Sequence, residues 1–286
     1  MTRRVWLRAA ALVCVVLGAI FGLTVYFSSE SEPPCLASGA PGWRPPADAE
    51  LHRYMVAFPD RAACFFALDD EQALVGAVRL DAASDPTVAA PLLDDVALRT
   101  AAGPYVVDLR HGTIVKGGVA PFDRDTLTLL DPQHRVLYVT QRDLLGFRVI
   151  DVATGRTLYV VHFKGFTWNR RFGPNPPSHG LALAPDRPEL WVLDAPNRTL
   201  HVFDVSALPA RAPRRVEDVR LERTLSTPGS LLQSADGKFL YVGGSGDVVD
   251  ARTRESVAQL AAVQKSRALL EVDWVDGKPF FPGYPR

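Results

Sequence analysis

The stretch "RVLYVTQRDLLGFRVIDVATGRTLYVV", residues Arg135–Val161, holds three short apolar runs separated by two turn-like interruptions. The runs are rich in β-branched and aromatic residues, which fit the half-buried surface of a sheet. A helix would instead show apolar residues at every third or fourth position. The stretch therefore predicts antiparallel strands, and the next question is whether it is a lone hairpin or one copy of a repeat.

The rest of the chain shows that it is a repeat. "LYVT" at 137–140 recurs as "LWVLD" at 190–194 and as "LYVGG" at 240–244. A turn rich in Pro, Asp or Gly precedes each copy. We expect the three aromatic residues of these copies to occupy equivalent buried places and to pack between sheets: Tyr138, Trp191 and Tyr241.

An aspartate ends the apolar run that follows each copy, and a fainter copy adds a fourth. Because these carboxylates recur at one position of the repeat, we expect them to accept hydrogen bonds from a turn rather than to act in catalysis. Successive aspartates are 43, 53 and 46 residues apart, close to the roughly 40–50 residues that four strands and three turns need. They are Asp108, Asp151, Asp204 and Asp250.

The fold class predicted is all-β, a β-propeller of four-stranded blades. In two blades we expect strands at 127–130, 136–140, 147–152 and 157–163, and at 181–184, 190–194, 199–205 and 216–221. Blades near 81–117, 118–164, 178–222 and 226–262, plus one that joins residues 63–80 to 268–281, give about five, with six or seven left open. Joining the two ends hides sheet edges.

The pattern of a "SADGK"-like turn, then "LYVT", then "VIDVATGRTLYVV" resembles the YVTN family of β-propellers, surface relatives of the WD-repeat proteins. The resemblance is strong over roughly residues 127–262 and weak before residue 100. It implies the propeller fold. It does not imply one activity, because members of the family serve as binding scaffolds, lactonase-like hydrolases or cofactor-enzyme subunits.

The N-terminus predicts export. Arg3, Arg4 and Arg8 precede an uncharged run at 9–27, which is long enough to cross a bilayer as a helix. Basic residues before the run and acidic residues after it place the bulk of the chain outside the cytoplasm. We expect a single-pass anchor in the cell membrane, the alternative being a cleaved signal and a secreted protein. Residues 2–8 also resemble a twin-arginine export signal, the other interpretation being only the positive-inside bias, and both export the domain.

Residues 1–27 are thus expected to form the anchor or signal segment, 28–49 a Pro/Ser/Gly-rich tether, and 50–286 the propeller domain. Cys35 and Cys64 face an oxidising compartment, where they either form a disulfide that pins the tether or stay free. Spacing alone does not decide between the two.

Composition excludes some partners. Lys+Arg and Asp+Glu both number 32, so no net field attracts nucleic acid. The chain contains no Gly-x-Ser-x-Gly, phosphate-loop or His-Glu-x-x-His motif, and we expect neither a cofactor nor a metal. A protein or small-molecule ligand on the loop face, with the membrane contacted through the N-terminal helix, is the expected set of partners.

The longest expected connection, residues 164–180, supplies most of the candidate binding residues. A Trp beside two guanidinium groups can stack on and pair with a carboxylate or aromatic ligand. The candidate ligand-binding residues are Trp168, Arg170, Arg171, His179 and Asp194.

Two further readings of this region remain open. His162, His179 and Asp194 form a candidate His/His/Asp set for metal binding or acid–base work. In a lactonase-like hydrolase, His179 would be the base and Arg170 or Arg171 would steady the oxyanion. We prefer the hypothesis that the domain is a binding scaffold.

Overall fold

The computed structural model describes residues 32–59, 61–80, 88–92, 95–100, 103–108, 113–116, 128–169, 177–223, 229–266 and 268–282, with backbone alone in 88–116 and at Thr128 and His179. Nearly all of them belong to one compact unit, Pro33–Arg286. The expected membrane span, 9–27, lies outside the described residues. From residue 32 onward, no helix among the described segments combines the length and the apolar character needed to span a bilayer.

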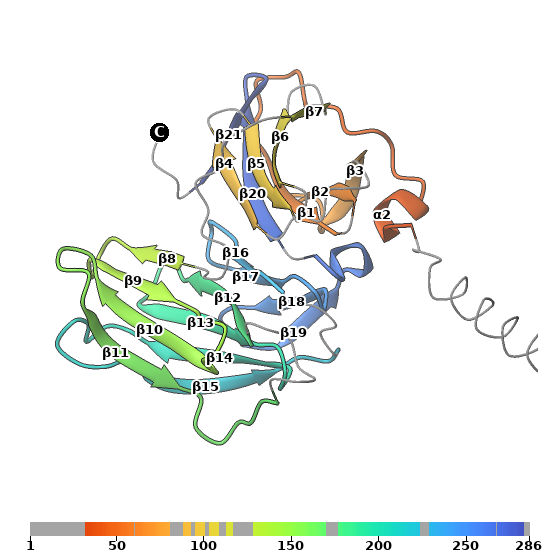
Figure 1. Ribbon diagram of the computed structural model, residues 1–286. Coiled ribbons are helices and arrows are strands. Elements are labelled where there is room, and N and C mark those ends of the chain that lie inside the picture. The colour runs from red at the N-terminus through yellow and green to blue at the C-terminus, as the bar shows by residue number, and fades with distance from the viewer. Residues whose placement is uncertain are drawn as a thin grey trace, which may run out of the picture. The chain divides into compact units, whose positions relative to one another are not determined.

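The described chain is almost entirely β-structure, and its strands form antiparallel sheets (Figure 1). Four sheets contain four strands each, and every strand pairs with its neighbour along the chain. Their bounds are β4 (Val88–Leu92), β5 (Asp95–Thr100), β6 (Gly103–Asp108) and β7 (Thr113–Lys116); β8 (Thr128–Asp131), β9 (Val136–Val139), β10 (Gly146–Asp151) and β11 (Thr157–His162); β12 (Ser178–Leu183), β13 (Glu189–Asp194), β14 (Thr199–Asp204) and β15 (Arg214–Arg220); and β16 (Leu231–Gln233), β17 (Phe239–Val242), β18 (Asp247–Asp250) and β19 (Ser256–Gln259).

The prediction of an all-β chain with four-stranded antiparallel sheets is confirmed, and the arrangement is consistent with a β-propeller. Both blades whose strands were predicted individually have all four strands. The largest shift is at β12, which begins at Ser178 rather than residue 181 because Ser178 and Gly180 still pair with Asp194 and Leu193 across an irregularity. Likewise β15 begins at Arg214, which pairs with Asp204.

The fifth sheet joins strands from both ends of the described chain. Its order is β21-β20-β1-β2-β3, with β1 (His52–Phe58), β2 (Ala62–Ala67), β3 (Ala73–Arg79), β20 (Ala268–Val275) and β21 (Lys278–Phe280). Strand β1 was not expected from the sequence. It lies between the two joined halves and pairs with β20 over its whole length, from His52 opposite Trp274 to Phe58 opposite Ala268.

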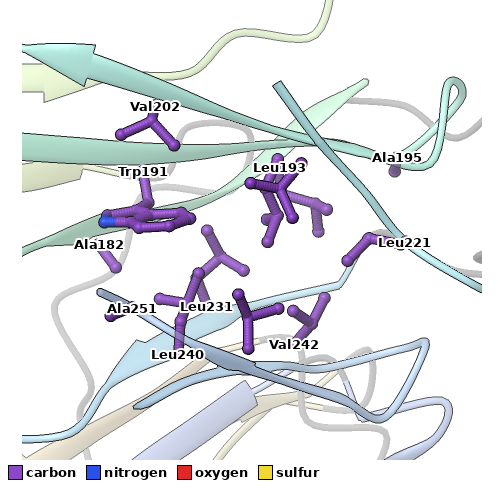
Figure 2. Close-up of a cluster of buried hydrophobic side chains, with 13 residues drawn as sticks. Ala182, Trp191, Leu193, Ala195, Val202, Leu221, Leu231, Leu240, Val242 and Ala251 are labelled. Atoms are coloured by element: carbon purple, nitrogen blue, oxygen red, sulfur yellow. The ribbon is translucent and has the colours of Figure 1, made fainter. Parts of the chain in front are cut away.

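The three repeated aromatic residues are buried at equivalent places, as predicted. Tyr138, Trp191 and Tyr241 lie on β9, β13 and β17, the second strands of their sheets, and have at most 1% of their surface exposed. Each packs in a cluster shared with the next sheet along the chain, the last of these being the joined sheet. Figure 2 shows the Trp191 indole directed toward Leu240 and Ala251 of the following sheet.

The repeated aspartates with described side chains accept hydrogen bonds from the turn that follows them, as predicted. Asp151 accepts from the N–H and hydroxyl of Thr154, and Asp204 accepts from the same groups of Ser206. Asp250 accepts from two backbone N–H groups. These hydrogen bonds lower the pKa of each carboxyl, which therefore stays ionised and holds the turn. The side chain of Asp108 lies outside the described part.

The N-terminal segment is fixed to the joined sheet by a disulfide. Cys35, in the one-turn helix α2 (Pro34–Ala37), is bonded to Cys64 of β2, with 6.0 Å between the Cα atoms. Trp43 then stacks on Phe65 at 4.0 Å between ring centroids. The packed chain therefore begins near residue 33, earlier than the boundary at residue 50, because Cys35 and Trp43 supply buried contacts within a Pro- and Gly-rich stretch.

A buried carboxyl group lies between the joined sheet and its neighbour. Glu271 of β20 is 5% exposed and accepts a hydrogen bond from the Ala235 N–H in the β16–β17 turn at 2.7 Å. Burial raises the pKa of Glu271 to about 7, and the nearby Asp273 carboxylate adds to the rise. Burial also raises the pKa of Asp273 to about 6.

We predict that Trp191→Ala lowers the free energy of unfolding by about 3–5 kcal/mol, because it leaves a cavity between two sheets. Val257→Ala, at a position that is 53% exposed, is the matched control and is expected to change stability by less than about 0.5 kcal/mol. Denaturant unfolding measures both. Equal effects of the two substitutions would contradict the buried placement of Trp191.

We predict that Glu271→Gln stabilises the protein at alkaline pH. The folded-state pKa lies above that of the unfolded chain, so the wild type loses stability as the pH rises through about 7. The gain is expected to be on the order of 1–3 kcal/mol at about pH 8 and to vanish below about pH 4. Thermal unfolding across this range is the measurement, with the exposed Glu255→Gln as control. A gain that is independent of pH would refute the explanation.

Candidate functional site

The described candidates, Trp168, Asp194 and the backbone of His179, belong to one end of the sheets, named here the loop end. It is formed by the connections between second and third strands and by those from one sheet to the next. Hydrogen bonds join the two kinds of connection: the Ala195 N–H donates to the Pro177 carbonyl at 3.1 Å, and the Lys265 N–H donates to the Gly244 carbonyl at 3.2 Å. The described connections of the loop end are 59, 61, 80, 140–145, 163–169, 177, 195–198, 221–223, 229–230, 243–246 and 260–266.

Residues 163–169, named here the rim segment, are held against the sheet β12–β15. The Asn197 side-chain amide donates to the Thr167 carbonyl at 3.0 Å. The Arg215 guanidinium donates to the Lys164 carbonyl at 3.0 Å and lies 5.4 Å from the centroid of the Phe166 ring. Two backbone carbonyls and one aromatic ring thus fix the rim segment to a neighbouring sheet.

His201 is at the centre of this contact. Its ring is fully buried, with Phe163 and Phe166 at 4.1 and 4.6 Å between centroids. Nδ1 lies 2.6 Å from Asp218 Oδ1, and Nε2 lies 3.2 Å from Asp194 Oδ2. Each ring nitrogen thus faces one carboxylate, and the two contacts fix the orientation of the ring.

Asp194 is occupied by internal partners. It is fully buried and accepts hydrogen bonds from the Asn197 N–H at 3.2 Å and from the Asn197 amide, which lies 2.9 Å from each carboxylate oxygen, in addition to facing His201. These bonds close the β13–β14 turn and orient Asn197 toward the rim segment. Asp194 therefore stabilises the loop end from a buried position.

The other candidates are distributed as follows. Trp168 is half-buried in the rim segment. It follows Thr167, whose carbonyl accepts a hydrogen bond from the Asn197 amide. Arg170 and Arg171 lie outside the described residues. The backbone of His179 belongs to β12, and its side chain is not described.

The histidine beside Asp194 is His201 and not a member of the expected His/His/Asp set; His162 of that set is exposed at the end of β11. His201 was not among the residues predicted from the sequence. Its only signal is a histidine inside the apolar strand "TLHVFD". Across the segments with described side chains, no three His, Cys, Asp or Glu residues are arranged to hold a metal ion.

Comparisons with known proteins supply no function. No protein-family model matches the chain, and no curated protein matches it. Among solved structures it is similar to Kuenenia stuttgartiensis hydrazine synthase (18% identity, 55% of this chain and 45% of that chain, TM-score 0.39) and to a Lactobacillus plantarum protein (18%, 74% and 66%, 0.38). A third similarity is to the Cps50 (Swd1) β-propeller domain of Myceliophteria thermophila (12%, 79% and 77%, 0.38).

This chain thus spans less than half of the hydrazine synthase chain and about two thirds of the Lactobacillus chain. At identities of 12–18% and TM-scores of 0.38–0.39, these similarities assign neither an activity nor a partner to it. Its chemistry has to be argued from its own residues.

We predict that His201→Gln loosens the rim segment. A glutamine cannot reach both carboxylates as the two ring nitrogens do, and it removes the surface on which Phe163 and Phe166 pack. We expect the amides of residues 164–169 to exchange with solvent at least about tenfold faster, as expected for losing a hydrogen bond to a charged group. Hydrogen exchange detected by mass spectrometry measures this.

His134→Gln is the matched control. His134 also pairs with a buried carboxylate, Asp131, at 2.7 Å, but at the opposite end of the sheet β8–β11. It is expected to leave the exchange of the rim segment unchanged. Unaltered exchange in His201→Gln would show that His201 does not hold the segment.

Proposed function

We propose that this chain is a β-propeller of the YVTN type that is exported, anchored in the cell membrane through residues 9–27, and used as a binding scaffold for a protein or small ligand at its loop end. The match between the quoted repeat and strands β8–β19 supports the family resemblance. The Cys35–Cys64 disulfide supports export, because such bonds persist in oxidising compartments.

The fixed rim segment is the observation that carries the binding function. Exposed Thr167 and half-buried Trp168 belong to this segment, which Asn197 holds at Thr167, Arg215 at Lys164 and His201 at Phe166. A loop that is already ordered loses little entropy when it binds, so its contact energy is available for affinity. Trp is also a residue type that contributes strongly at interfaces.

The hydrolase alternative finds less support. It needs a base near the loop end with a polar group to orient it, and Asp194, the candidate orienting carboxylate closest to β12, is occupied by Asn197 and His201. Its proposed base and oxyanion groups, His179 and Arg170 or Arg171, have no described side chains. The scaffold is therefore the function that the described geometry favours.

We predict that the rim segment contacts the partner. Full-length protein is used, because truncation at residue 45 would remove both Cys35 and Trp43. A photo-crosslinking amino acid is placed at Thr167, and for control at exposed Ala210 in the β14–β15 connection at the opposite end. We expect a discrete adduct from position 167 alone, and Trp168→Ala is expected to reduce its yield about fivefold or more, equivalent to about 1 kcal/mol of binding energy.

Equal adducts from both positions, or none from position 167, would contradict the proposal. Turnover of a lactone or ester that His179→Ala abolishes, with an unchanged melting temperature, would replace it with the hydrolase.

A further inference from the structure

The described part of the loop end is basic although the whole chain is neutral. Among exposed side chains of its described connections and of the strand residues flanking them, six are basic: Arg79, Arg142, Lys164, Arg220, Arg223 and Lys265. The exposed acidic ones in this described set are Asp143 and Glu222. The charge balance of the composition therefore conceals a local excess of positive charge.

Charges at the opposite end are of both signs, and several of them form ion pairs. Arg187 pairs with Asp186 and Glu189, at 3.0 and 2.8 Å. Arg254 pairs with Glu189 at 2.7 Å and also with Glu217, and Lys238 lies 3.3 Å from Asp236. The two ends thus present different electrostatic surfaces, and the loop end is the one suited to an anionic partner.

The disulfide fixes the N-terminal segment near the loop end. Cys35 is bonded to Cys64, two residues from the start of β2 at the loop end, and packs in one cluster with Val263. Val263 belongs to the short 3-10 helix η1 (Ala261–Val263), which lies in the loop-end connection from β19 to β20. Figure 1 shows α2 beside β3, whose last residue is the basic Arg79.

The chain between this disulfide and the proposed anchor is short. Residues 28–34 separate Phe27, the last residue of the apolar run, from Cys35. Seven residues span at most roughly 25 Å when fully extended. In the proposed anchored protein, Cys35 therefore lies within roughly that distance of the bilayer.

We propose that the loop end docks on the membrane surface, with its basic side chains against anionic lipid headgroups. This inference rests on the proposed anchor and deepens it by assigning the domain an orientation in which the partner held by the rim segment is bound at the membrane surface. The attraction acts over a Debye length, roughly 10 Å at 0.1 M salt, which is shorter than the tether, so docking adds to tethering rather than following from it.

The test uses the full chain reconstituted in vesicles through its N-terminal segment. Cys14 is replaced by Ser, and a donor fluorophore is attached to Thr167→Cys at the loop end or to Ala210→Cys at the opposite end. Rhodamine on lipid headgroups is the acceptor, and vesicles rich in phosphatidylglycerol are compared with vesicles of pure phosphatidylcholine. We expect strong transfer from position 167 and weak transfer from position 210 in the anionic vesicles.

Transfer from position 167 is expected to fall in phosphatidylcholine and when salt is raised to about 0.5 M, where the Debye length is under about 5 Å. Charge reversal to Glu at Arg142, Arg220 and Lys265 is expected to abolish the difference between the two lipids. The matched variant reverses exposed charges of the opposite end, Arg156, Arg211 and Lys278, and is expected to behave as the wild type.

Flotation separates the two proposals. A chain that floats with vesicles of either composition in high salt but shows equal transfer from both positions, or transfer independent of lipid charge, overturns the docking and leaves the anchor intact. A chain that does not float with phosphatidylcholine vesicles overturns the anchor, and with it the tethered docking.

Discussion

The pairing of β1 with β20 is the interaction on which the rest of the structure depends. It joins residue 52 to residue 274 and residue 58 to residue 268, so the two ends of the described chain share one sheet. Without it, β1–β3 and β20–β21 would each expose a strand edge, which is a site of aggregation. The Cys35–Cys64 bond is built on this sheet and brings the N-terminal segment to the loop end.

The same sheet supplies the last member of a series of packed sheets. Tyr138, Trp191 and Tyr241 each face the following sheet, and the cluster around Tyr241 includes Met55 and Leu269 of the joined one. A series of this kind leaves the loop end free to vary, because the packing lies in the strands and not in the connections. The rim segment is one such connection, and His201 and Arg215 of the neighbouring sheet hold it in place.

The sequence predicts the regular parts of this structure well and the joining parts poorly. Turns rich in Pro, Asp or Gly and the aromatic after each one place β8–β15 to within a few residues, because the signals are local. Strand β1, "HRYMVAF", belongs to no repeat, and its partner lies at the far end of the chain. The sequence did not predict whether the two cysteines form a disulfide, because a separation of 29 residues specifies no geometry.

The candidate site, too, was predicted only where the signals are local. The sequence identified the long connection and Trp168, but the contacts that fix the segment come from Asn197, His201 and Arg215, whose roles depend on how two sheets pack. Asp194 was recognised as a polar residue at a strand end, whereas its partners were not. The basic loop end escaped notice because its charges are scattered along a neutral sequence.

The central claim, that both ends of the chain close one sheet, is tested most directly by native-state hydrogen exchange of the β1 amides in the intact protein. The account predicts that amides of residues 54–57 exchange only through global unfolding, with the same free energy as those of residues 269–272 opposite them. Exchange of β1 by local opening at a much lower free energy, with β20 still protected, would contradict it.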